Sequence, residues 1–282
     1  SSAQQITWRG GFVDIRVDPE RFSPAALSLL KRLPSTNDPC GQMTYAFRND
    51  SNQMQSIGRV DYQRTKDDTI FGRYMSTSFT APIPMREGDS VLSLYDNANR
   101  VGLLGSDALA QSLAIGDTRV FGPNTVHALR FAFNRSAVSR LAPVTFEPHD
   151  LGVDAYSYQP HVMWIEVQGG FFAENPGPSR FVTNASQISD DLTLVRGNHQ
   201  IAVGASLARF NVSFQTWARG GGQWNFTGQA SGLGIADFLL GRIGFMDQSG
   251  LTGVDYYQWY HGSYIQDTWR ASSRLTVNAG LR

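Results

Sequence analysis

The stretch from Tyr264 to Arg282, YIQDTWRASSRLTVNAGLR, decides the fold. From Leu275 onward, apolar residues alternate with polar residues or glycine. Strict alternation is typical of a β-strand with one apolar and one polar face. The polar segment 270–274 separates this strand from a strand-like first half. The stretch therefore predicts a β-hairpin with a short turn.

Three more segments repeat this pattern of strand, short polar turn and returning strand. They cover residues 57–79, with a turn at 64–68; residues 111–136, with a turn at 122–124; and residues 186–214, with a turn at 196–199. Four such hairpins predict an all-β fold of antiparallel, up-and-down strands.

Long irregular segments separate the hairpins, at about residues 76–108, 136–180 and 215–256. Soluble domains seldom contain structureless loops longer than about 15 residues. Short turns that alternate with long loops are typical of outer-membrane barrels, whose strands of about 10 residues are apolar outside and polar inside. We therefore expect part of a transmembrane β-barrel wall, in which the strands pair all backbone polar groups.

The alternation assigns each strand residue to one of two faces. We expect the face of Leu129, Phe131 and Phe133, and that of Leu275, Val277, Ala279 and Leu281, to meet lipid. The candidates for the lumen are Arg59, Asp61, Arg130, Asn134, Asn278 and Arg282.

Aromatic residues gather in VDYYQWYHGSY, residues 254–264. The cluster of Tyr256, Tyr257, Trp259, Tyr260 and Tyr264 allows two interpretations: stacking on a sugar or aromatic ligand at the cell surface, or an aromatic girdle at the membrane interface. Trp269, near the short turn, would belong to the periplasmic girdle, although Asp267 would share its face.

Two short helices are expected within the loops. Ser23 can act as an N-cap, with Pro24 at the first helical position and Pro34 as a stop. A second short helix is expected in GIADFLLG, residues 234–241.

Composition argues against several other classes of protein. The formal net charge is zero, which speaks against nucleic-acid binding. No apolar run reaches the roughly 18 residues of a transmembrane helix. The histidines are scattered, so we expect no metal site. Adjacent aspartates such as Asp190 and Asp191 point to opposite faces and cannot form an acid–base pair. No phosphate-binding or nucleophile motif occurs, so we expect no cofactor and no catalysis. Cys40 is either a buried thiol or the partner of an upstream cysteine.

The hairpins resemble those of TonB-dependent outer-membrane receptors, in particular the Oar-like class with an N-terminal carboxypeptidase-regulatory-like domain. The residues that carry this resemblance are RFSPAALSLLKRLP, GRVDYQ with FGRY, FGPNTVHALRFAFNRS, SQISDDLTLVRGNHQIAVG, GIADFLLG and YIQDTWRASSRLTVNAGLR.

The resemblance implies a barrel of about 22 strands around a plug, and uptake of a ferric chelate, a saccharide or a peptide driven through TonB. The chain, with roughly ten strands, would then be an internal fragment spanning residues 1–282. The plug, the N-terminal domain and the C-terminal strands would lie outside it. The implied partners are outer-membrane lipid, the TonB complex through the plug, and an unknown extracellular ligand.

Two alternatives remain open from the residues alone: a secreted β-sandwich that binds carbohydrate, and a β-rich glycoside hydrolase. Two stacked sheets with a shared core would favour either of them, whereas one continuous sheet would favour the barrel.

Overall fold

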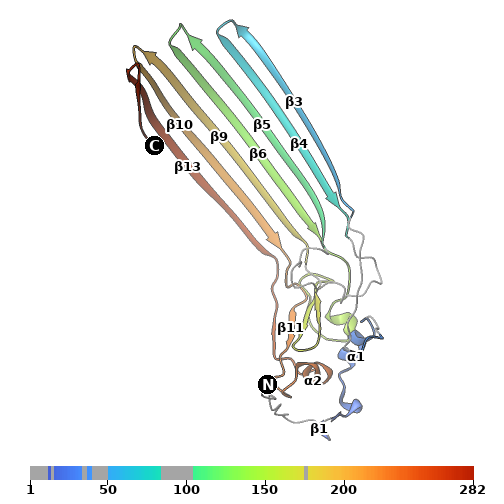
Figure 1. Ribbon diagram of the computed structural model, residues 1–282. Helices are drawn as coiled ribbons and strands as arrows, with labels where there is room; N and C mark the ends of the chain where they lie inside the picture. The colour runs from blue at the N-terminus through green and yellow to red at the C-terminus, as the bar shows by residue number, and fades with distance from the viewer. Residues whose placement is uncertain (1–11, 14–15, 34–36, 40–49, 84–103, 175–176) are drawn as a thin grey trace.

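A computed structural model describes residues 12–13, 16–33, 37–39, 50–83, 104–174 and 177–282 (Figure 1). Cys40 and Pro34 lie outside these residues. Eight strands form one antiparallel sheet in the order β14-β13-β10-β9-β6-β5-β4-β3. Their bounds are β3 Asn52–Thr65, β4 Asp68–Ala81, β5 Gly105–Phe121, β6 Thr125–Leu141, β9 Ser179–Arg196, β10 His199–Thr216, β13 Thr252–Ser272 and β14 Leu275–Leu281.

All four expected hairpins are confirmed, each closed by a short turn at the same end of the sheet (Figure 1). Consecutive hairpins lie side by side, so the topology is up-and-down throughout. One continuous sheet, rather than two stacked ones, favours the barrel wall over the β-sandwich.

The strands are longer than expected. The longest, β13, has 21 residues, although a tilted strand of about 9–11 residues crosses a bilayer. Strand pairing therefore continues for several residues into the segments expected to be irregular: β4 runs to Ala81, and β6 runs to Leu141. The large sheet of the described residues holds eight strands, whereas about ten were expected for the chain.

The two long segments that follow β6 and β10 are not structureless. Between β6 and β9, and between β10 and β13, they form a second sheet in the order β12-β11-β7-β8 at the end away from the short turns (Figure 1). Its strands are β7 Trp164–Val167, β8 Phe172–Glu174, β11 Gln223–Phe226 and β12 Phe245–Asp247; β7 and β11 pair in parallel. This small sheet and the helices packed on it are called the loop module below.

The helices of the loop module include both that the sequence predicted. Helix α1 spans Pro24–Leu30, and its Ser23 N-cap accepts a hydrogen bond from the amide of Ala26. Helix α2 spans Gly234–Leu239, and its Leu239 carbonyl accepts a 2.7 Å hydrogen bond from the amide of Ser23. The short elements β1 Phe12–Val13, β2 Arg16–Val17, η1 Pro19–Arg21 and η3 Pro148–Leu151 complete the described structure.

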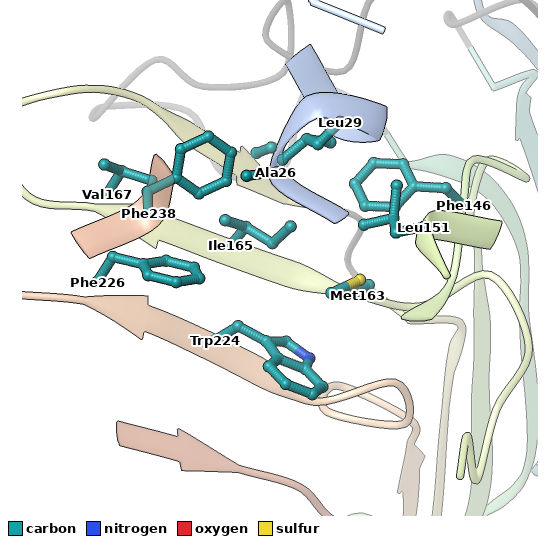
Figure 2. Close-up of a cluster of buried hydrophobic side chains, with 11 residues drawn as sticks. Ala26, Leu29, Phe146, Leu151, Met163, Ile165, Val167, Trp224, Phe226 and Phe238 are labelled. Carbon is teal, nitrogen blue, oxygen red and sulfur yellow. The ribbon is translucent and has the colours of Figure 1, made fainter. Parts of the chain in front are cut away.

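The main apolar core lies in the loop module rather than in the large sheet. Leu29, Phe146 and Phe238 are at most 2% exposed, and they pack with side chains from β7 and β11 (Figure 2). The core joins α1, from the start of the chain, to the two long loops. Among the described residues, no helix is long and apolar enough to cross a membrane.

Candidate functional site

The strand register gathers the predicted lumen residues on one face of the large sheet. Residues directly opposite each other in an antiparallel pair share a face. A single row therefore crosses the wall on that face: Asp61 pairs with Phe71, Phe71 with Gly116, Gly116 with Arg130, and Arg130 with Ser189. This face is called the polar face.

The other predicted lumen residues follow the same register. Arg59 lies two residues before Asp61 in β3, and Asn134 lies four residues after Arg130 in β6, so both share the face of the row. Asn278 pairs with Thr268 on the polar face. Arg282 directly follows Leu281, the last residue of β14, so alternation also assigns it to the polar face. The six residues thus share a face but do not form one contact cluster.

One network on the polar face spans four strands. Arg130 Nη1 of β6 donates to Asp191 Oδ2 of β9 at 2.9 Å, and the Tyr264 hydroxyl of β13 donates to Asp191 Oδ1 at 2.8 Å. Between β9 and β13 lies Gly204 of β10, which pairs with both Asp191 and Tyr264. A Cβ at Gly204 would lie less than 3.0 Å from the Tyr264 ring and the Asp191 carboxylate. Because Gly204 has no side chain, Tyr264 can reach across β10 to Asp191.

A second network lies at the β3 edge, and it too places an aromatic ring over a glycine. Arg59 pairs with Asp61 through two hydrogen bonds of 2.8 and 2.6 Å, and the Arg59 guanidinium lies 4.5 Å from the centre of the Phe71 ring. Phe71 in turn covers Gly116, where a Cβ would lie less than 3.0 Å from the ring. Two glycines on the polar face therefore lie under aromatic rings: Gly116 in the row of Arg130, and Gly204 in the neighbouring row of Asp191.

The polar face combines fixed charges with groups that remain accessible. The side chains of Arg130 and Asp191 are 49% and 33% exposed, and those of Arg59 and Asp61 about half exposed. Guanidinium, carboxylate and phenol groups held in place by each other can hydrogen-bond a polar ligand or a polypeptide surface. Within the described residues, no group of three or more His, Cys, Asp or Glu is arranged to hold a metal ion.

The opposite face, called the apolar face, exposes large hydrophobic side chains. Leu129, Phe131, Ile188 and Leu207 are 39–47% exposed although they lie in the middle of the sheet. Contiguous exposed apolar surface of this kind marks a membrane or protein interface.

The aromatic candidates divide between the two faces. Tyr257 and Trp259 lie on the apolar face, where the Arg209 guanidinium sits 5.7 and 5.3 Å from their ring centres. Tyr256 and Tyr260 alternate with them and lie on the polar face. A girdle on the apolar face therefore remains a prediction for Tyr257, Trp259 and Trp269 alone.

The part of the apolar face near the short turns carries histidine–aspartate pairs that sequence reasoning missed. His127 Nε2 lies 2.6 Å from Asp190 Oδ1, and His199 Nδ1 lies 2.6 Å from Asp267 Oδ2. The His199 ring stacks on Trp269. Asp267 does share the face of Trp269, as expected, and it is paired there with His199.

Asp191 is a functional candidate that sequence reasoning did not find, and Tyr264 was expected only as a member of the aromatic cluster, not as a partner of Asp191. Asp191 was expected only to point away from Asp190, which the register bears out. The signal for Tyr264 is a glycine directly opposite an aromatic residue in a neighbouring strand, and it is readable only once the register is known.

Among solved structures, the chain is similar to the open form of the ferric-catecholate import receptor Fiu from E. coli K12. It is 15% identical, with a TM-score of 0.41, over 82% of this chain and 35% of the receptor chain. The chain thus spans about a third of that receptor's length. No curated protein matches. The family model described as an outer membrane beta barrel domain matches residues 1–282, and the chain therefore belongs to this family of outer-membrane proteins.

Proposed function

We propose that the full-length protein is a TonB-dependent receptor, resembling the Oar-like class, that imports a ligand through a barrel to which this chain contributes eight wall strands. The apolar face meets outer-membrane lipid, and the polar face lines the lumen. The loop module lies at the extracellular end, because short turns are periplasmic and long loops extracellular in such barrels.

The observation that carries this proposal is the segregation of the two faces. A passive structural barrel needs an apolar exterior, but it does not need a lumen wall with paired charges held in place across several strands. The networks around Arg130 and Asp61 supply such a wall. A plug or a polar ligand passing through the lumen would find donors and acceptors there that are already oriented.

The same reasoning favours a non-enzymatic role. On the strands that the structure describes, the polar face holds no nucleophile positioned by a base and a third orienting group, the arrangement typical of covalent catalysis. Two of its charge pairs, Arg59–Asp61 and Arg130–Asp191, are held in place as in a binding surface.

The experiment is an uptake assay with the complete gene in its native host. Cells expressing or lacking the gene are offered a ferric catecholate, an oligosaccharide and a peptide, with and without a protonophore and in a strain lacking TonB. We expect one class of ligand to accumulate only in energised cells that contain TonB. Accumulation that persists without TonB would mean an open pore and would overturn the proposal.

Substitutions on the polar face connect the transport result to the structure. Asp191→Asn removes the charge that binds Arg130 and Tyr264, so we expect slower uptake with unchanged protein level. Asp190→Asn is the matched control, because it makes the same chemical change one residue away on the opposite face. Equal effects of the two variants would contradict a role for the polar face.

A further inference from the structure

The loop module contains an apolar cavity of about 190 Å³ that opens to the surface. Its floor is formed by α1 on one side and by β7, β11 and α2 on the other, whose side chains point toward one another (Figure 2). The floor side chains are at most 8% exposed: Leu29, Met163, Ile165, Trp224, Phe226 and Phe238.

The floor offers a ligand carbon surface and almost no hydrogen-bonding groups. The one polar atom of the Trp224 side chain, Nε1, already donates a 3.0 Å hydrogen bond to the carbonyl of Gly221. The other floor side chains are hydrocarbons or a thioether. Water placed there would lack the two to four polar partners that a buried water needs, so a cavity of this kind stays dry and takes apolar guests.

The mouth of the cavity is kept clear by a glycine. Ser23, Gly241 and Ile243 border the opening, and Ile243 is 43% exposed. Gly241 ends the α2 segment with φ +66°, and a Cβ there would lie 3.0 Å from Ser23 Cβ and 3.1 Å from its Oγ. Any side chain at Gly241 would be strained and would also crowd the entrance.

We propose that this cavity is a binding site for a compact apolar group, of the size of a single aromatic ring or a short branched alkyl chain. An apolar cavity of about 150 Å³ accommodates benzene, so 190 Å³ suits such a group and is too small for a drug-sized molecule. The binding of an apolar group stands on the cavity alone. Its role as the first contact of the imported ligand rests on the proposed function.

Crystals of the full-length protein pressurised with xenon locate the site, and titration with fluorobenzene followed by ¹⁹F NMR measures its affinity. We expect xenon density between α1 and β11, and saturable fluorobenzene binding. Ala25→Leu fills the cavity from α1 and should weaken binding at least about tenfold, or about 1.4 kcal/mol.

Ser28→Leu is the matched control, because it adds an apolar side chain to the same helix but away from the cavity lining. Detergent takes up the same amount of fluorobenzene in the samples of both variants, so comparing the two variants removes this contribution. Ile243→Ala, at the exposed mouth, gives a second variant that does not disturb the core.

Absence of xenon from the cavity, or equal fluorobenzene binding by Ala25→Leu and Ser28→Leu, would overturn this inference. A cavity that binds xenon in a protein that imports none of the offered ligands would refute only the proposed function. An active importer whose cavity stays empty would refute only the cavity site.

Discussion

Replacing Gly204 by alanine tests the register of the wall at its most constrained point. The new Cβ would lie less than 3.0 Å from both the Tyr264 ring and the Asp191 carboxylate. Either the wall is overpacked, at about 1–3 kcal/mol, or Tyr264 swings away and its hydrogen bond to a charged group is lost, at about 1.5–3 kcal/mol. Either change relieves the clash, so only the smaller of the two free-energy penalties applies and the two do not add.

A gain partly offsets this loss, because alanine in a strand interior is about 0.5–1 kcal/mol better than glycine. We expect Gly204→Ala to lower the free energy of unfolding by about 1–2 kcal/mol. In a Tyr264→Ala background the ring is absent, and Asp191 Oδ1, released from the Tyr264 hydroxyl, can turn away from the new Cβ. The same change should then stabilise by about 0.5–1 kcal/mol. The coupling energy between the two sites is then about 2 kcal/mol.

The assay is urea unfolding of the full-length protein in lipid vesicles, for the two single variants and the double variant. Gly72→Ala, in β4, is the control, because no atom lies within 4 Å of the Cβ it would add. It should be neutral or slightly stabilising. A Gly204→Ala effect that is the same with and without Tyr264 would show that the ring does not lie over Gly204, and would refute the register.

Two further substitutions probe the apolar face and the loop module. Ile188→Arg should destabilise the wall by about 2–4 kcal/mol, because it places a charge on the lipid face, whereas Gln187→Arg on the polar face should stay within about 0.5 kcal/mol; urea unfolding in vesicles measures both, and equal losses would contradict the assignment of faces. Asp237 is fully buried and accepts hydrogen bonds from the amides of Ala230 and Ser231 at 3.1 and 2.8 Å. Asp237→Asn should therefore lower the stability of the loop module by about 1–3 kcal/mol. Hydrogen exchange should show faster amide exchange in the loop module and unchanged exchange in the wall.

Periodicity in the sequence was enough to predict the wall. The alternation through Leu129, Phe131 and Phe133 and the short turns need only local information, and the N-cap at Ser23 is likewise a local signal. These features were confirmed because each depends only on residues that are close together in the sequence.

The features that were missed depend on contacts between distant segments. The reach of Tyr264 over Gly204 to Asp191 requires three strands to be in one register. The parallel pairing of β7 with β11 joins two loops, and each loop alone lacks the length and alternation of a wall strand. Local patterns do not encode which of several short apolar runs meet, so the loop module and its cavity could not be predicted.

The most direct test of the central claim is which face of the sheet meets lipid. Spin labels at Leu207 and Ser206, neighbours in β10, would be introduced through single cysteines in a Cys40→Ser background and compared in lipid vesicles. We predict that the label at Leu207 collides mainly with oxygen dissolved in the bilayer, and that the label at Ser206 collides mainly with a water-soluble nickel chelate. Equal or reversed accessibility at the two positions would contradict the account of this chain as a barrel wall with a polar lumen.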